Sequence, residues 1–315
     1  MNSDVLLDKI KSLPSVEKNR YSLFPFGRER YYYGKNWADE TVFIIKSKNH
    51  NSKRYAQVTK ELRLDMNVKS EFIINNDIMS DQVNIMTCTS NEIEKQIAFL
   101  RLCSAFVDAN IQEEAEVIGL FNAFISLFSN KLKRSINELQ GLFTELFVMY
   151  YFEQRDINLY KFWQKEDYRI HDFYVTDIKR IEIKSTSGGV RQHHFKHEQL
   201  LLDIHDVKVV SIFARRADKG LSLQGLIQKI RQSKFVTYSV LLHIERLISN
   251  YSEDELENIQ FDEHLLDNSL EIFDAHKIPR FNEKQPNGLF NAEYDSDLSN
   301  INPYAISDFI NWLGI

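Results

Sequence analysis

The chain has 315 residues, of which 43% are hydrophobic and 27% are charged, with only 10 glycines and 5 prolines. This length and composition are sufficient for a large buried core in more than one domain, and they exclude a disordered or low-complexity chain. The formal net charge of −6 argues against a protein that binds nucleic acid indiscriminately through a wholly basic surface.

Secretion and membrane insertion are not expected from the sequence. The first residues, MNSDVLLDKIKSLP, mix charged with apolar side chains and lack the apolar stretch of a signal peptide. The longest apolar run, residues 117–128, contains Asn122 and is too short to cross a bilayer. Cys88 and Cys103 fit neither a metal motif nor a disulfide framework. We therefore expect a cytoplasmic protein with no membrane association.

Residues 1–90 are expected to form a β-rich N-terminal domain that contacts DNA or a partner. Runs of β-branched and aromatic residues mark its strands, at 41–45, 62–68, 71–74 and 83–87. The preceding segment, FPFGRERYYYGKNW, mixes aromatic with basic residues. Packing of these rings inside the domain is favoured, and a nucleic-acid contact through Arg28, Arg30 and the tyrosines is the alternative.

Helical periodicity follows at residues 91–134, which we interpret as a helical connector. The next helix is predicted to begin at Ser135, which opens a capping-box pattern. Within it Leu142, Glu145 and Met149 share one row, so Glu145 lies at the margin of an apolar stripe. A carboxylate in that position is costly unless it reaches solvent, is paired or binds a metal.

Two strands joined by a short turn are predicted next, over 170–175 and 180–184. Folding this hairpin places Asp172 opposite Glu182, with their Cβ atoms roughly 5 Å apart. Two like charges at that separation destabilise a sheet unless a cation lies between them, and Mg²⁺ commonly takes one or two carboxylates. Lys184 shares a face with Glu182, so its ammonium could approach the attacking water or a scissile phosphate.

The remaining segments complete an α/β layer. Their apolar patterns predict a buried strand at 207–213, helices at 221–230 and 236–249, a strand near 270–273 and a last helix at about 304–313. Gln199 opens a short helix, where its amide could contact the phosphate, the attacking water or Lys184; an ordinary surface amide is the alternative. His193 and His197 would share a helical face suited to zinc, but no further ligand accompanies them.

Charge is unevenly distributed along the second half of the chain. Residues 179–234 contain twelve basic and five acidic residues, a net +7, whereas residues 253–297 contain three basic and thirteen acidic residues, a net −10. The positive segment coincides with the predicted hairpin, as contact with a phosphate backbone requires. The alternative is that both segments are ordinary solvated surfaces of opposite sign.

The motifs GLFTELF, HDF, EIKST and EQL, in this order, resemble those of the PD-(D/E)XK superfamily of restriction-endonuclease-like proteins. Within it they are similar to a family of PD-(D/E)XK motif proteins found beside DNA methyltransferases and ATPases in bacterial restriction and phage-defence clusters. The resemblance covers residues 135–235 well and the N-terminal region loosely. The Pro of the superfamily's name is absent, because His171 precedes Asp172.

The resemblance implies an α/β (mixed α+β) fold with a restriction-endonuclease-like αβββαβ core at residues 135–240. The charges, helical patterns and prolines of residues 241–315 themselves predict an acidic, helical and loop-rich C-terminal region. It implies catalytic roles for Glu145, Asp172, Glu182, Lys184 and Gln199, with Asp172, Glu182 and Glu145 as the metal ligands. The expected activity is Mg²⁺-dependent endonucleolytic hydrolysis of double-stranded DNA within a restriction-modification or phage-defence system, with Mn²⁺ able to substitute. The expected assembly is a homodimer or a complex with ATPase and methyltransferase subunits.

Two alternatives are compatible with the same residues. One is a catalytically silent DNA-binding or assembly subunit that keeps the nuclease fold, and the other is a nuclease that acts on RNA or branched DNA. Retention of opposed carboxylates argues against the silent subunit, because binding alone does not require them. No Walker pattern is present in the sequence, so any ATP-driven step would need a partner.

Overall fold

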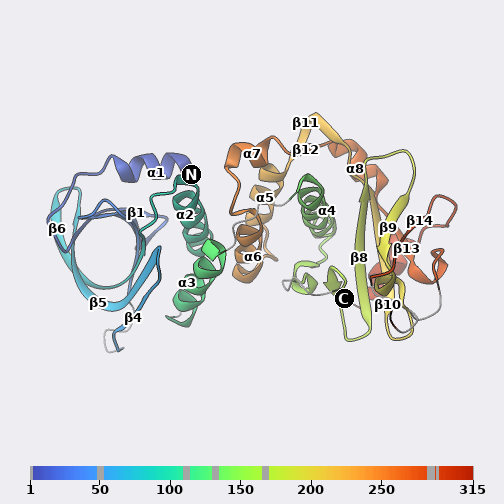
Figure 1. Ribbon diagram of the computed structural model, residues 1–315, viewed down its shortest axis with the longest axis horizontal. Helices are drawn as coiled ribbons and strands as arrows, with labels where there is room; N and C mark the ends of the chain where they lie inside the picture. Colours follow the sequence, from blue (N-terminus) through green and yellow to red (C-terminus); the bar gives the residue numbers. More distant parts are fainter. Residues whose placement is uncertain are drawn as a thin grey trace. The chain divides into compact units, whose positions relative to one another are not determined.

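The structure is a computed structural model that describes residues 3–47, 53–108, 114–129, 135–164, 170–281, 288 and 291–314. The chain divides into two compact units (Figure 1). The barrel unit comprises Met1–Lys133 and Thr237–Glu253, and the sheet unit comprises Arg134–Val236 and Asp254–Ile315. No helix within the described ranges is long and apolar enough to cross a membrane.

The contacts group the chain into two units, and the four segments expected from the sequence stay a prediction. Helix α6 (Tyr238–Ile248) belongs to the barrel unit, although its first residues fall within 135–240, the segment expected to form the nuclease core. Residues Asp254–Ile315 belong to the sheet unit, where strand β13 (Glu271–Asp274) pairs with the central strand β10 (Asp206–Phe213). Composition and local patterns do not reveal such pairings between distant segments.

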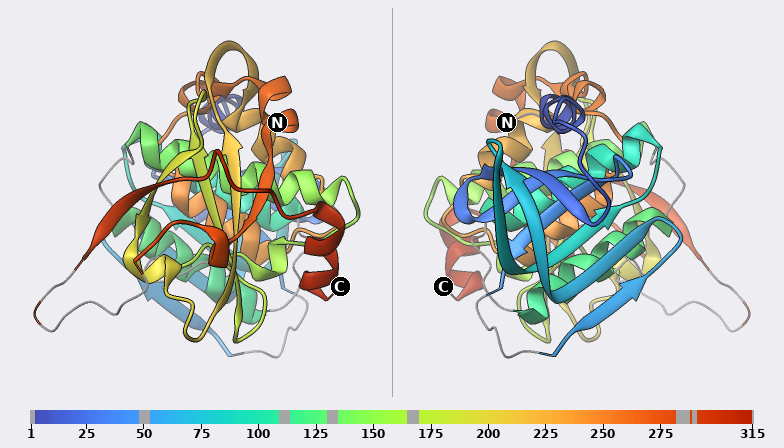
Figure 2. Two further views of the ribbon diagram at one scale, coloured as in Figure 1. Left: turned by 90° about the vertical axis from the view of Figure 1, so that its right-hand side faces the viewer. Right: turned by 90° about the vertical axis from the view of Figure 1, so that its left-hand side faces the viewer.

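Five strands of the barrel unit close into a ring in the order β1-β2-β3-β6-β5, with β5 pairing back to β1 (Figure 1, Figure 2). These strands are β1 (Arg20–Phe26), β2 (Arg28–Asn36), β3 (Thr41–Lys46), β5 (Leu62–Ile74) and β6 (Asp77–Cys88), and β4 (Tyr55–Val58) pairs with β5. Strand direction cannot alternate around a ring with an odd number of strands, so one neighbouring pair must be parallel. That pair is β1 with β5, and the other ring pairs are antiparallel. The sheet-rich N-terminal region is therefore confirmed.

The ring has two buried faces. One packs against helices α1 (Ser3–Lys11), α2 (Ile93–Asp108) and α3 (Glu114–Ser129). The other face forms a cluster to which all five ring strands contribute and, among the described residues, no helix does, so it fills the interior of the ring. Its members are Leu23, Tyr32, Val42, Ile44, Phe72, Val83 and Ile85.

The aromatic and basic segment before β3 mainly packs this domain. Tyr31 and Tyr33 are fully buried on the face covered by helices, in agreement with the interpretation favoured from the sequence. Arg30 Nη2 donates to the backbone carbonyl of Lys46 at 3.1 Å, which uses part of its hydrogen-bonding capacity inside the protein. The side chain of Arg28 lies outside the described part of the chain.

The sheet unit is built on a four-stranded sheet in the order β13-β10-β8-β7, seen in the left panel of Figure 2. β8 (Lys179–Thr186) and β10 run parallel, and β7 (Phe173–Tyr174) is antiparallel to β8. Helix α4 (Ile136–Glu153) packs against β8, and Ser135 caps it with the capping box predicted from the sequence. The buried strand predicted at 207–213 is β10, in the interior of this sheet.

The predicted mixture of α and β structure is confirmed, whereas the specific αβββαβ order stays a prediction. An isolated antiparallel bridge joins Trp163 to Phe173, so the first of the three expected strands is represented by a single pairing. The crossover from β8 to the parallel β10 contains β9 (Gln192–Lys196) and the 3₁₀ turn η2 (His197–Leu200), where the predicted order has an α-helix.

Shorter elements flank this sheet. They are η1 (Tyr160–Phe162), β11 (Arg216–Ser222), α5 (Leu223–Arg231), α7 (Glu253–Glu257), β12 (Gln260–Phe261), α8 (Glu263–Ser269), η3 (Ala275–Lys277), β14 (Glu293–Asp297) and α9 (Ile306–Leu313). β9 pairs with β14, and β11 pairs with β12. Because β9 is a strand, His193 and His197 do not share a helical face, and the zinc spacing considered from the sequence does not apply.

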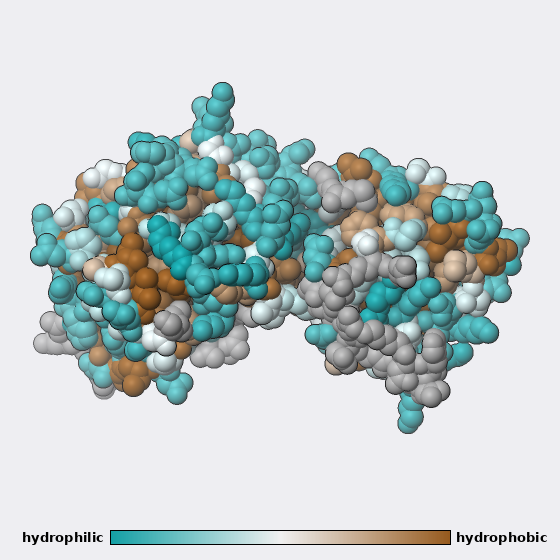
Figure 3. Space-filling model, turned by 180° about the vertical axis from the view of Figure 1, so that it is seen from behind, coloured by the Kyte–Doolittle hydropathy of each residue, from teal (hydrophilic) through white to brown (hydrophobic). Residues whose placement is uncertain are grey.

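Exposed apolar side chains do not mark a site. The large ones are distributed between the two units, from Val5 to Phe281. The face shown in Figure 3 mixes small hydrophobic areas with a mostly hydrophilic surface. The charged residues of the hairpin are therefore the stronger candidates for a functional site.

Candidate active site

The β7–β8 hairpin brings two of the predicted carboxylates together. Phe173 pairs with Ile181 in the antiparallel ladder, so one step further along the same register Asp172 lies opposite Glu182. This is the pairing expected from the sequence, although Asp172 precedes a strand of only two residues instead of lying inside a longer one. Opposed residues of a ladder share a face of the sheet.

Glu182 is buried, with 2% of its surface exposed. Its Oε1 accepts a hydrogen bond of 2.6 Å from Gln199 Nε2 and lies 2.9 Å from Lys184 Nζ. Its Oε2 has no hydrogen-bond partner within the described part of the chain. Burial raises the pKa of Glu182, and the Lys184 ammonium opposes that rise. A buried carboxylate oxygen without a partner is costly, so Oε2 indicates a place for a ligand.

Asp172 is enclosed next to this group. Its Oδ2 accepts a hydrogen bond of 2.7 Å from the backbone N–H of Ile183. The residue keeps partial exposure, but burial of the carboxyl, followed by the charge of Glu182, holds its pKa well above the usual range. A bound cation would reverse this effect, because it stabilises the ionised form of both acids.

Lys184 is held by two acceptors. Its Nζ lies 2.9 Å from Glu182 Oε1 and 2.9 Å from Gln199 Oε1, and it sits 5.0 Å from the centre of the Phe195 ring. An ammonium has three N–H donors. Two of them are therefore engaged, and no described residue accepts from the third, which could donate to a phosphate oxygen.

Gln199 uses both ends of its amide and is nearly buried. Its Oε1 accepts from Lys184 Nζ and from the backbone N–H of Lys196, and its Nε2 donates to Glu182 and to the carbonyl of Ile170. If the amide were flipped, its NH₂ group would face the Lys184 ammonium, and two donors would oppose each other. These partners therefore determine which end of the Gln199 amide is the oxygen. The contact between Gln199 and Lys184 that was considered from the sequence is therefore present. The alternative, an ordinary amide on the surface, is excluded because Gln199 is buried.

His171 holds the turn that carries Gln199. Its Nε2 lies 3.1 Å from the backbone carbonyl of Gln199. Because a carbonyl only accepts, Nε2 carries the hydrogen. Burial lowers the pKa of His171 to about 4, so the ring is neutral at physiological pH. In the sequence His171 was notable only as the residue that replaces a proline.

Glu145 is connected to the site less directly. Trp163 Nε1 donates to its Oε2 at 2.6 Å, and the charge of Glu145 contributes to the raised pKa of Glu182. Within the described residues, no three His, Cys, Asp or Glu side chains gather closely enough to hold a metal ion. The metal site that includes Glu145 therefore stays a prediction. No sequence signal identified Trp163, whose contact depends on its bridge to Phe173.

A family model described as "Putative PD-(D/E)XK family member, (DUF4420)" matches residues 27–299, which is most of the chain. The chain belongs to this PD-(D/E)XK family. Membership indicates a nuclease-like function, and the resemblance noted in the hairpin motifs is confirmed. No curated protein and no solved structure matches the chain.

The donor set of this PD-(D/E)XK chain fits a divalent cation at Asp172 and Glu182. Both are oxygen donors, and Glu182 Oε2 is buried without a partner among the described residues. Mg²⁺ is commonly bound through one or two carboxylates and keeps several waters, so a third protein ligand is not required. Glu145 is not needed for this fit.

The positive segment of the PD-(D/E)XK chain is largely neutralised by its acidic segment. Among the described residues, four ion pairs of arginine or lysine join them: Arg191 to Glu271 at 2.8 Å, Lys208 to Asp274 at 3.5 Å, Arg215 to Asp262 at 3.1 Å and Lys229 to Glu263 at 3.3 Å. The net +7 of residues 179–234 therefore does not form one continuous basic surface. A count along the sequence overstates the cations available to DNA near the hairpin, because it cannot show which acids lie opposite them.

Proposed function

We propose that the chain is a Mg²⁺-dependent DNA endonuclease that hydrolyses phosphodiester bonds. The observation that carries this proposal is that Glu182 lies opposite Asp172, with its Oε2 buried and without a partner among the described residues, and with the Lys184 ammonium beside its Oε1. The charge of Glu182 contributes to the raised pKa of Asp172. Two opposed acids destabilise a sheet, so a sheet with only a structural role would gain nothing from them. The same groups suit a site that binds a cation and a phosphate.

Asp172 and Glu182 would hold the ion, and Mn²⁺ could replace Mg²⁺. When bound, the ion would supply Lewis-acid chemistry by lowering the pKa of water and by neutralising charge on the phosphate. Lys184 would donate its third N–H to a phosphate oxygen and stabilise the negative charge that develops in the transition state. Gln199 would keep that ammonium and the Glu182 carboxylate in a fixed relative position.

The proposed biological setting is a bacterial restriction-modification or phage-defence system in the cytoplasm, with double-stranded DNA as the substrate. Cutting both strands normally requires two centres, so we propose a homodimer or a complex with ATPase and methyltransferase subunits. The absence of a Walker pattern from the sequence supports an external source for any ATP-driven step.

Nicking of supercoiled plasmid by the purified protein with Mg²⁺ tests the proposal. Wild type is expected to nick the plasmid, and Glu182→Gln is expected to be inactive. Glu198→Gln is the matched control, because it makes the same chemical change at an exposed position of η2. Equal nicking by wild type and Glu182→Gln would refute the assignment of this site.

A second candidate is a catalytically silent DNA-binding or assembly subunit. It is favoured by one observation, the lack of a group of three potential metal ligands in the described residues. This candidate would be supported if wild type and Glu182→Gln were both inactive in every nicking assay but both retarded DNA on a gel. Parallel assays with RNA and with branched DNA test whether the proposed chemistry acts on another substrate.

A further inference from the structure

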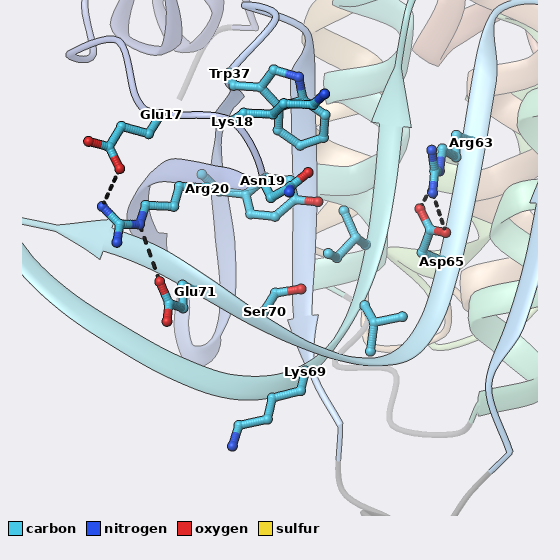
Figure 4. Close-up of a pocket in the computed structure, with 13 residues that line it drawn as sticks. Glu17, Lys18, Asn19, Arg20, Trp37, Arg63, Asp65, Lys69, Ser70 and Glu71 are labelled. Carbon is cyan, nitrogen blue, oxygen red and sulfur yellow. Dashed lines mark hydrogen bonds and ion pairs between the residues drawn. The ribbon is translucent and has the colours of Figure 1, made fainter.

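A cavity of about 510 Å³ opens at one end of the strand ring in the barrel unit (Figure 4). Tyr21, Val68 and Ile85 form an apolar part of its lining. Ile85 belongs to the cluster that fills the ring, and Tyr21 and Val68 pack against that cluster. The cavity is therefore the mouth of the barrel, a common position for ligand sites, and its volume lies within the usual range for them.

Trp37 provides an aromatic surface at this mouth. It follows β2 in the chain and keeps 38% of its surface exposed. The ring of Tyr21 supports it edge to face, with centroids 6.1 Å apart and planes 68° apart. A large indole that stays exposed at a cavity and is held by a second ring offers a platform for stacking a flat ligand.

The charged residues around the mouth are mostly neutralised by one another. Arg20 pairs with Glu17 at 3.0 Å and with Glu71 at 3.2 Å. Arg63 pairs with Asp65 through two hydrogen bonds of 2.5 and 2.9 Å. These pairs account for all three acids that line the cavity.

Lysine side chains supply the positive charge that remains. Lys18 and Lys69 also line the cavity, and neither has an ion-pair partner within the described residues. Figure 4 shows Lys69 extending away from the other lining residues. Lys18 is therefore the better placed of the two to meet an anion.

We propose that the mouth of the barrel binds an unpaired nucleotide, with its base stacked on Trp37 over the apolar lining and its phosphate contacting Lys18. An aromatic platform combined with a cation is the recurring chemistry of single-strand binding. A base within a duplex hides its faces by stacking, so the site would select single-stranded or extruded nucleotides. An added peptide strand is disfavoured here, because β1 and β5 already pair with each other beside the cavity.

This site is independent of the proposed nuclease function. It lies in the barrel unit, and nucleotide binding there requires neither a metal ion nor cleavage. The experiment is therefore performed with the full chain in EDTA. Fluorescence anisotropy of a short labelled single-stranded oligonucleotide gives the dissociation constant, with the matching duplex as a second probe and an unlabelled nucleoside monophosphate as competitor.

Wild type is expected to bind the single strand more tightly than the duplex. Trp37→Ala is expected to weaken single-strand binding about tenfold. Tyr55→Ala is the matched control, because Tyr55 is an exposed aromatic residue of the same unit that does not line the cavity. Lys18→Ala is expected to weaken binding and to reduce its salt dependence, whereas Lys60→Ala, an exposed lysine outside the cavity, should change neither.

Three outcomes would overturn the proposal: Trp37→Ala that binds as wild type does, an equal loss in Tyr55→Ala, or no binding of any nucleotide probe by wild type. If the unlabelled nucleoside monophosphate displaces the oligonucleotide, the ligand is a free nucleotide. If it does not, the ligand is a single strand. If circular dichroism shows that Trp37→Ala is unfolded, the Lys18→Glu variant is the test instead, because Lys18 is exposed. The proposal requires that Lys18→Glu lose binding of the single strand.

Discussion

Gln199 and Glu182 are joined by a hydrogen bond of 2.6 Å from the amide nitrogen of the first to Oε1 of the second. The oxygen of the same amide accepts from Lys184 Nζ at 2.9 Å. One side chain therefore sets the position of the acid relative to the ammonium. This makes Gln199 a positioning residue, whose removal should leave the charges in place but disorder their geometry.

Gln199→Ala is expected to lower the nicking rate about 10- to 100-fold, as for other residues that orient the ligands of a metal site. Binding of uncleaved DNA without divalent ions should stay close to wild type. The acidic limb of the pH–rate profile should move to higher pH, because Glu182 loses a donor that stabilises its ionised form. Gln192→Ala, at an exposed position of β9, is the control. An unchanged rate and profile would contradict this role.

Trp163→Phe should lower nicking about tenfold by releasing the Glu145 carboxylate from the indole N–H. Trp312→Phe is a matched control, since Trp312 Nε1 donates to Asp206 Oδ2 at the same 2.6 Å distance outside the site. Both variants lose a partly buried hydrogen bond of the indole N–H, so thermal unfolding should show comparable destabilisation. Equal loss of nicking in the two would show that Glu145 has no special role.

Asp172→Asn is expected to stabilise the metal-free fold at pH 8 by about 1 kcal/mol. The folded state raises the pKa of Asp172, so the wild-type fold loses stability as pH rises from the usual carboxyl range through this raised value. The difference between variant and wild type should therefore disappear near pH 4. Urea unfolding in EDTA at both pH values measures it, with Asp177→Asn in the exposed turn as control. A destabilised variant at pH 8 would refute the electrostatic interpretation.

Much of the hairpin could be predicted from the sequence, because it depends on local order. Alternation placed Glu182 and Lys184 on one face, and the short turn fixed the register that sets Asp172 opposite Glu182. The support of the site could not be predicted in the same way. Trp163 reaches Glu145, and His171 reaches the Gln199 carbonyl, only after distant segments have packed.

The charge pattern shows the same limit. The sequence gives the numbers of basic and acidic residues in each segment correctly. It does not show that ion pairs such as Lys229 with Glu263 neutralise charges of one segment with those of the other. The closure of the ring by the parallel pairing of β1 with β5 was also out of reach, because no local pattern in either strand specifies a partner so far along the chain.

The paired charges lead to a further expectation about DNA affinity. Lys196→Ala should weaken duplex binding by about 1 kcal/mol and reduce the salt slope by about one, because Lys196 is exposed and has no ion pair within the described residues. Lys229→Ala should change affinity less than about twofold, since its ammonium already pairs with Glu263. Anisotropy titrations at several salt concentrations measure both, and the reverse order would contradict the expectation.

The most direct test of the central claim is anomalous diffraction from crystals of the protein soaked in Mn²⁺. The account predicts one anomalous peak between the carboxylates of Asp172 and Glu182, lost in Glu182→Gln and retained in Glu198→Gln. An ordered hairpin with no peak there, or a peak that persists in Glu182→Gln, would contradict it.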